Sequence, residues 1–196
     1  MTPTFNQFAA ALALSVAAVL PAQADSIFFE GTFAPEASGA TGTGSLFMAY
    51  DDDANTLAIN ATWSGLSGTT STAHIHCCTA LANTGTAGVA LAQGGILPGF
   101  PLGASGGSYV RLIDLAATTS YGAAFLTASG GTSALAEARL FSNLASGNAY
   151  FNIHSTTFGG GEIRAFVTAV PEPSTYASML LGLVVLGAWM RRRRHA

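Results

Sequence analysis

Three histidines are the side chains of this sequence whose type and spacing best suit chemistry. His74 and His76 lie two residues apart in a run, residues 72–78, that otherwise has the character of a β-strand. Strand side chains alternate between the two faces, so both imidazoles share one face. A second strand-like run, residues 150–154, places His154 on its polar face. If the two strands lie side by side, three imidazoles meet, and imidazole is a ligand that copper and zinc accept.

Three uses of this histidine group remain open. The first is a transition-metal site in which Glu162 and Arg164, which share a strand face by the same alternation, support the ligands or gate access. The second is a hydrogen-bonded network of the same five side chains that pins two strands together. The third is a redox enzyme, because a His-x-His pair with a distant third histidine resembles the copper side of copper–zinc superoxide dismutases. Those enzymes use more histidines than this region has, and no bridging histidine is visible.

Strand patterns between residues 26 and 167 provide the elements that must position these side chains. The cleanest alternation is in the run whose apolar positions are Leu57, Ile59, Ala61 and Trp63. We expect strands at residues 26–33, 44–50, 56–63, 72–78, 89–91, 108–115, 149–154 and 162–167. Many short strands with glycine-rich turns predict an all-β fold, an antiparallel Greek-key-like sandwich or barrel with one short helix.

A helix and a long loop complete this predicted domain. Residues 133–146 predict the helix, with Ser133 as its N-cap and Gly147 just past its end. Its expected apolar stripe consists of Leu135, Ala138, Phe141, Leu144 and Ala145. Residues 79–107 are rich in glycine and alanine and predict a long loop around the short strand, and loops of that length are functional or mobile.

Charge excludes one class of partner. The 196 residues contain no lysine, and four of the seven arginines stand at residues 191–194. Residues 25–170 carry nine acidic side chains against three arginines, which gives this body a net charge of −6. Phosphate contacts need clustered lysine and arginine, so we expect no nucleic acid among the partners.

The N-terminal 24 residues have the pattern of a signal peptide. Residues 8–20 are apolar, and Ala22-Gln23-Ala24 is a small-x-small triplet that predicts cleavage after Ala24. Residues 1–7 contain no lysine or arginine, so a short membrane anchor is the alternative. We expect export of a body that covers residues 25–169.

The C-terminal segment, residues 170–196, predicts a temporary anchor. Pro171-Glu172-Pro173 precedes a hydrophobic helix at residues 176–190 and the arginine tail at 191–194. Fifteen helical residues span roughly 22 Å, less than the ~30 Å hydrocarbon core, so the span is marginal. The arginines would stay on the cytoplasmic side and leave the body outside. An ordinary anchor that is never cleaved is the alternative.

These three ordered parts resemble the PEP-CTERM sorting signal. The resemblance implies recognition and processing by an exosortase, transient contact with the inner membrane, and a Gram-negative bacterium, usually one that makes extracellular polysaccharide. It also implies that the mature protein is exported to the cell envelope or surface, or is secreted.

Adjacent cysteines follow the His-x-His pair. Neighbouring Cα atoms lie ~3.8 Å apart, which is below the usual separation for a disulfide. Free thiols, thiolate ligation, a bond to another chain and a vicinal bridge between Cys77 and Cys78 therefore compete. An exported compartment favours oxidation, so we expect a vicinal or an intermolecular disulfide.

Two further signatures resemble the CHRD domain, a module named for chordin. They are residues 73–76 early in the chain and residues 148–154 with 160–164 late in it. The resemblance spans about residues 26–167, and it departs from the family at Cys77-Cys78, where glycine is common, and at Gly159, where proline is common. It implies an extracellular all-β module and brings no catalytic residues.

Two functions follow as expectations. The first is a non-enzymatic binding or structural module of the bacterial envelope or extracellular matrix, with extracellular polysaccharide or matrix proteins as partners. The alternative is a copper- or zinc-binding redox protein that uses the histidine face as a superoxide-dismutase-like site. Metal content separates the two.

Overall fold

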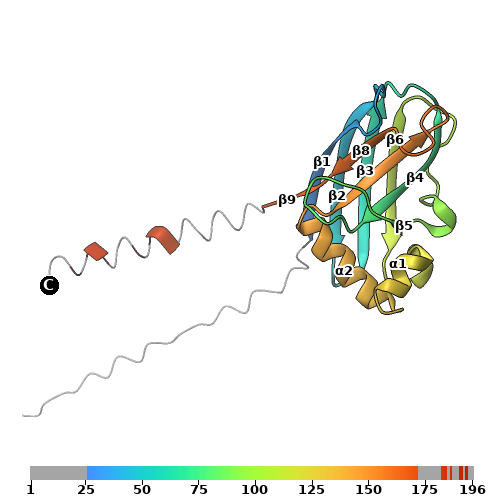
Figure 1. Cartoon of the computed structure of the whole chain (residues 1–196). Coiled ribbons are helices and arrows are strands. Elements are labelled where there is room, and N and C mark those ends of the chain that lie inside the picture. The colour runs from blue at the N-terminus through green and yellow to red at the C-terminus, as the bar shows by residue number, and fades with distance from the viewer. Residues whose placement is uncertain (1–25, 172–181, 185, 187–189, 192, 194–196) are drawn as a thin grey trace, which may run out of the picture.

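Alternating apolar side chains build one antiparallel sheet that curls into a half-barrel (Figure 1). The computed structural model describes residues 26–171, 182–184, 186, 190, 191 and 193. Within these residues the strands are β1 Ile27–Pro35, β2 Thr43–Asp51, β3 Thr56–Ser64, β4 Thr70–Cys77, β5 Val89–Leu91, β6 Gly107–Asp114, β7 Ala149–Ser155, β8 Ile163–Phe166 and β9 Thr168–Val170. Their order is β5-β4-β7-β8-β1-β2-β3-β6, with β9 paired to β1. The predicted all-β, antiparallel class is confirmed.

The inner face of the sheet is the hydrophobic core. All four apolar positions expected on β3 are buried, and their neighbours on β1 and β2 include the fully buried Phe29, Leu46 and Met48. Burying each such side chain contributes about 1.5–3 kcal/mol. Because the alternation fixes which side chains face inward, it also fixes which ones the sheet presents on its outer face.

Two short α-helices lie together at one end of the sheet (Figure 1). The predicted helix is α2, Ser133–Ala145, and its N-cap is Thr132, whose side chain accepts from the Leu135 amide at 3.4 Å. Gly147 follows the helix with φ 72°, a conformation that favours glycine. The sequence did not predict α1, Ala123–Ala128, nor the 3₁₀ turns η1, Gln93–Gly95, and η2, Thr118–Ser120.

The buried face of α2 differs from the predicted stripe. Leu135 is 53% exposed, whereas the buried positions are Ala136, Glu137, Leu140 and Leu144. The Tyr50 hydroxyl donates to the Glu137 carboxylate at 3.0 Å. Burial raises the pKa of Glu137, and this hydrogen bond partly offsets the rise. A buried acid therefore stands at a position outside the predicted apolar stripe, because a partner on β2 satisfies it.

The predicted terminal segments fall mostly outside the described residues. Residues 1–25 and 172–181 lie outside them, and so do the signal peptide and Glu172 and Pro173 of the sorting motif. Of the predicted hydrophobic helix, residues 182–184, 186 and 190 are described and helical. Among the described residues no helix has the length and hydropathy that crossing a membrane requires.

Phe151 tests the core that backs β7. It is fully buried, and its ring meets that of Phe33 edge-on at a centroid distance of 5.5 Å. We expect Phe151→Ala to lower the free energy of unfolding by about 3–5 kcal/mol, measured by urea titration. The matched control is Phe47→Ala on the outer face, where the ring is 45% exposed, with an expected loss below about 1 kcal/mol. Equal losses in the two variants would contradict the assignment of the core face.

Candidate metal centre

The pairing of β4 with β7 brings the three predicted histidines together. Across this antiparallel pair Thr72 faces His154, His74 faces Asn152 and His76 faces Tyr150. Directly opposed residues share a face of the sheet. The alternate residues are fully buried in the core and comprise Ala73, Ile75, Phe151 and Ile153. The imidazoles therefore lie together on the outer face.

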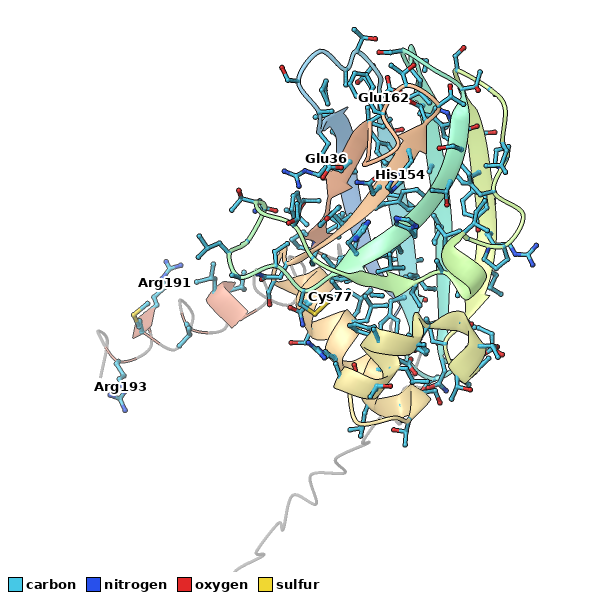
Figure 2. The ribbon with its side chains drawn as sticks, turned by 45° about the vertical axis from the view of Figure 1, so that its right-hand side comes forward. Glu36, Cys77, His154, Glu162, Arg191 and Arg193 are labelled. Atoms are coloured by element: carbon cyan, nitrogen blue, oxygen red, sulfur yellow. A yellow bond between two sulfur atoms is a disulfide. The ribbon has the colours of Figure 1, made fainter. Side chains whose placement is uncertain are left out.

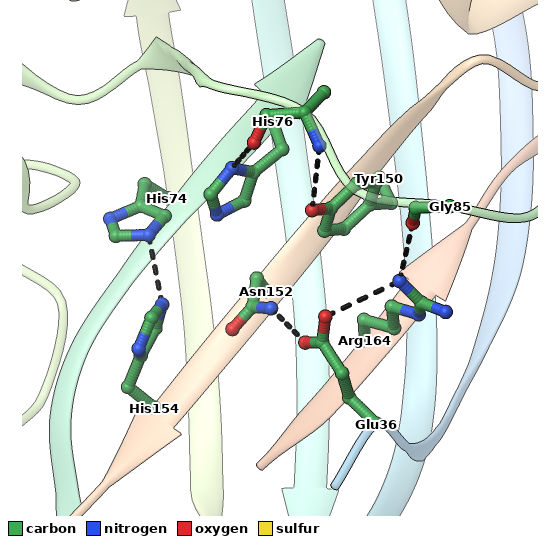
Figure 3. Close-up of polar contacts among 9 residues, drawn as sticks. Glu36, His74, His76, Gly85, Tyr150, Asn152, His154 and Arg164 are labelled. Atoms are coloured by element: carbon green, nitrogen blue, oxygen red, sulfur yellow. Dashed lines mark hydrogen bonds and ion pairs between the residues drawn. The ribbon is translucent and has the colours of Figure 1, made fainter. Parts of the chain in front are cut away.

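The three rings are in direct contact (Figure 3). The Nε2 atoms of His74 and His154 are 2.9 Å apart, and the His74 ring lies 4.6 Å from each of the other two by centroid distance. One ligand atom from each histidine falls within 4.8 Å of the others. His74 and His154 are 7% and 8% exposed, and His76 is half-buried. The three histidines therefore form a compact and largely buried cluster of nitrogen atoms that could ligate a metal ion.

Backbone carbonyls fix the tautomer of every ring. Each Nδ1 contacts a carbonyl oxygen, which can only accept, so each Nδ1 carries the proton and donates. The three bonds are His74 to Gly95 at 3.1 Å, His76 to Ala87 at 2.7 Å and His154 to Gly159 at 2.8 Å. In a neutral ring, the Nε2 atom therefore carries no proton and keeps a lone pair that can bind a metal ion or accept a hydrogen bond.

These donors fit a transition-metal ion. Two Nε2 lone pairs that meet at 2.9 Å repel each other unless a proton or a cation lies between them. The Nε2 of His76 is buried and has no hydrogen-bond partner among the described residues. Nitrogen ligands of a tetrahedral ion with bonds near 2.0–2.1 Å stand roughly 3.3 Å apart. The His74–His154 pair at 2.9 Å is already close to that spacing, whereas the nitrogen of His76, within 4.8 Å of the others, must move closer. Histidine ligands usually donate their second N–H to a carbonyl or carboxylate, as all three do here.

Burial favours the neutral forms of His74 and His76 by lowering the pKa of each. It lowers the pKa of His74 to about 4, against the opposing hydrogen bond to Gly95, and the neighbouring His76 and His154 lower it further. Burial also lowers the pKa of His76. A metal ion competes with protons for these nitrogens, so lowered pKa values leave the ligands available at neutral pH.

A chain of polar contacts runs from Asn152, which faces His74 across the β4–β7 pair, to Arg164 on β8. The Arg164 guanidinium pairs with the Glu36 carboxylate at 3.3 Å and donates to the Gly85 carbonyl at 2.7 Å. The Asn152 amide donates to the other oxygen of Glu36. Arg164 therefore lies on the histidine face, and its contacts extend through Glu36 to Asn152, which stands opposite His74.

Tyr150 forms a second connection. Its ring stacks on His76 with centroids 4.8 Å apart and planes 13° apart. Arg164 stands over the Tyr150 ring at 5.4 Å and over Phe166 at 5.2 Å, and such cation–π contacts are attractive. The Tyr150 ring, which itself contacts the Arg164 guanidinium, therefore supports the His76 ring on one side.

Glu162 has a different environment from Arg164. It precedes β8 and is fully buried, and its carboxylate accepts from the Ser67 amide. Burial raises the pKa of Glu162, but the Ser155 hydroxyl and the amides of Ser67 and Gly68 lower it by more, so the net shift is downward. Figure 2 shows Glu162 toward one end of the sheet and Cys77 beside the helices at the other. None of these hydrogen bonds of Glu162 goes to a histidine.

The two cysteines form a vicinal disulfide, and the peptide bond between them is cis. Cys77 faces Ala149 across the β4–β7 pair and is buried in the core. Of the four arrangements open from sequence, the structure has the bridge within the chain. Neither sulfur is a thiolate, so the candidate ligand set consists of imidazole nitrogens.

Asn152, Glu36 and Tyr150 were not among the predicted site residues. Asn152 and Tyr150 stand two and four residues before His154, so the alternation that selected His154 also assigns them to its face. Glu36 follows β1 in a loop, and its approach to Asn152 depends on tertiary packing. No local pattern marks it.

The fold and the cluster together define a small antiparallel β domain with a buried three-histidine centre on its outer face. Residues 26–167 match the family model of the CHRD domain, and the chain belongs to the CHRD domain family. Residues 169–194 match the PEP-CTERM protein-sorting motif, which identifies an extracellular bacterial protein sorted by exosortase. Both resemblances are thereby confirmed. No curated protein and no solved structure matches the chain.

The lowered pKa of His74 predicts a pH dependence of stability. The folded pKa of about 4 lies below the unfolded value near 6.5. His74 thus contributes stability above pH 6.5, and this contribution is lost as the pH falls toward 4. In chelator-treated protein we expect the unfolding free energy to fall between pH 7 and 5 by roughly 1–2 kcal/mol more in the wild type than in His74→Gln. Parallel curves for the two proteins would contradict the assigned environment of His74.

Proposed function

We propose that the protein is an extracellular CHRD module that binds one transition-metal ion, copper or zinc, through Nε2 of His74, His76 and His154. Its role is binding and not catalysis. The observation that carries the proposal is the convergence of three imidazoles, one ligand nitrogen of each within 4.8 Å of the others, whose rings are all oriented by Nδ1 hydrogen bonds to carbonyls. A set of neutral imidazoles suits both metals.

A purely structural hydrogen-bonded network accounts for these contacts less well. A network needs donors matched to acceptors, whereas the cluster presents three acceptors to one another. One proton could bridge His74 and His154, but it would leave Nε2 of His76 without a partner. Burial also makes that proton costly, because it lowers the pKa of His74 to about 4. A single cation satisfies all three nitrogens at neutral pH.

The cellular setting follows from the two ends of the chain. We propose that residues 1–24 are removed on export and that residues 170–196 hold the protein briefly in the inner membrane of a Gram-negative bacterium. An exosortase then processes this segment and releases the body, residues 25–169, to the cell surface or the matrix. The sorting motif at residues 169–194 supports this route.

Metal titration tests the site. We expect the purified full chain to bind one Cu²⁺ or Zn²⁺ ion and, at a free metal concentration of 100 Kd, to gain about 2.7 kcal/mol of stability. His74→Gln and His154→Gln should lose this gain, and the control His195→Gln should keep it. Wild-type protein without bound metal, whose Tm a chelator leaves unchanged, would refute the proposal. Superoxide turnover by the loaded protein would favour the redox alternative.

Processing gives a second test. Replacing Pro171, Glu172 and Pro173 with alanine in the native host should leave the chain in the membrane fraction with an intact C-terminus. The wild type should appear at the surface or in the medium without its arginine tail, as mass spectrometry of the C-terminus would show. An uncleaved wild-type protein in the membrane would instead indicate a permanent anchor.

A groove on the outer face favours a matrix polysaccharide as a partner. It has a volume of about 710 Å³ and spans β1, β2, β3, β8 and β9. Its lining combines the rings of Phe47 and Phe166 with the carboxylate of Glu30 and the amide of Asn60. Aromatic faces suit the apolar faces of sugar rings, and convergent polar groups fix orientation.

Affinity electrophoresis in gels that contain the host's own polysaccharide tests this groove. We expect the wild type to be retarded and Phe47→Ala to lose most of the retardation, since an exposed ring is removed without emptying the core. Val110→Ala, an exposed apolar position outside the groove lining, is the matched control. Equal mobility of all three proteins would exclude the groove as a polysaccharide site.

A further inference from the structure

Asn152 presents an unpartnered oxygen on the histidine face. The residue is 1% exposed and stands opposite His74 across the β4–β7 pair. Its amide nitrogen donates to Glu36, whereas its Oδ1 is buried without a hydrogen-bond partner among the described residues. Figure 3 shows Asn152 between His76 and His154, with the nitrogen turned to Glu36 and the oxygen away from it.

The identity of that oxygen follows from its neighbours. Amide nitrogen and oxygen are assigned from their hydrogen bonds. An ionised carboxylate only accepts, so the Asn152 atom that contacts Glu36 must be the NH₂ group. Arg164 pairs with Glu36 and keeps the carboxylate in place. The atom left on the histidine side is therefore a pure acceptor.

Two buried acceptors thus stand on one face of the sheet, Nε2 of His76 and Oδ1 of Asn152. A buried polar atom without a partner destabilises the folded protein, so each of the two atoms calls for a partner. A metal ion provides the partner for the nitrogen. The oxygen of Asn152 is not among the three nitrogen ligands. Its partner must therefore be a hydrogen-bond donor.

We propose, on the basis of the proposed metal site, that the ion bound by the three histidines takes an exogenous protic oxygen ligand, water or hydroxide, and that this ligand donates to Oδ1 of Asn152. Three protein ligands leave an open position on the ion, which water commonly fills. Asn152 acts as a positioning residue. Because Oδ1 cannot donate, it favours ligands that carry a proton over anions that carry none.

Anion binding to the copper-loaded full chain tests this role. Azide has no proton to donate. In the wild type it must therefore displace a water that is hydrogen-bonded to Oδ1 of Asn152, and it leaves that oxygen without a donor. Asn152→Leu has a similar shape and removes that oxygen. We expect it to keep one Cu²⁺ with three nitrogen ligands by EPR, to change the exchangeable-proton coupling of the bound water in ENDOR spectra because the hydrogen bond is gone, and to bind azide roughly tenfold more tightly.

Two further variants complete the experiment. Asn60→Leu, the same change at an exposed position on β3, should leave both signals and the azide affinity unchanged. Glu36→Gln allows the Asn152 amide to rotate, because a glutamine can accept or donate, so its azide affinity should lie between those of the wild type and Asn152→Leu. This variant also reports on the site if Asn152→Leu fails to fold.

The outcomes separate this inference from the metal site itself. Equal azide affinity in wild type, Asn152→Leu and Glu36→Gln, on protein that holds copper through three nitrogens, would overturn the role of Asn152 and leave the metal site standing. A wild type that binds no copper would overturn both. Tighter azide binding in Asn152→Leu with a changed coupling of the bound water's protons supports the proposal.

Discussion

The register between β4 and β7 is the constraint on which the candidate site depends. Cross-strand pairing puts the histidine-bearing positions of both strands on the outer face and the fully buried Ala73, Ile75 and Ile153 on the other. Because side chains alternate, a slip of one residue would move every histidine of a strand into the core. The hydrophobic core therefore holds the site together, although it contributes none of the donor atoms.

Loops complete what the strands begin. The carbonyls that orient the rings belong to Gly95, Ala87 and Gly159, and all three lie between elements of the sheet. Gly95 has φ 90°, a conformation that favours glycine, and its oxygen also accepts from the Thr72 hydroxyl. The long glycine-rich stretch that precedes β6 is thus partly ordered over the cluster. This stretch fixes the tautomers of His74 and His76, and Gly159 between β7 and β8 fixes that of His154.

Much of this arrangement could be predicted from the sequence, because it follows from alternation along strands. The strands, the shared face of His74 and His76, and the position of His154 all come from a period of two. What could not be predicted rests on contacts between distant segments. Glu36 reaches Asn152 from a loop 116 residues away. On α2, Glu137 is buried because Tyr50 provides a partner that no helical pattern contains.

The charges around the cluster indicate where its affinity for a cation would come from. Glu36 is the carboxylate connected to the site through Asn152, and its charge is balanced by Arg164. The disulfide removes both thiolates. A bound ion would therefore meet neutral nitrogens and an amide oxygen instead of an anionic pocket. Such a site has no anionic ligand of its own, so its strength depends on how rigidly the carbonyls and the Tyr150 stack hold the three rings.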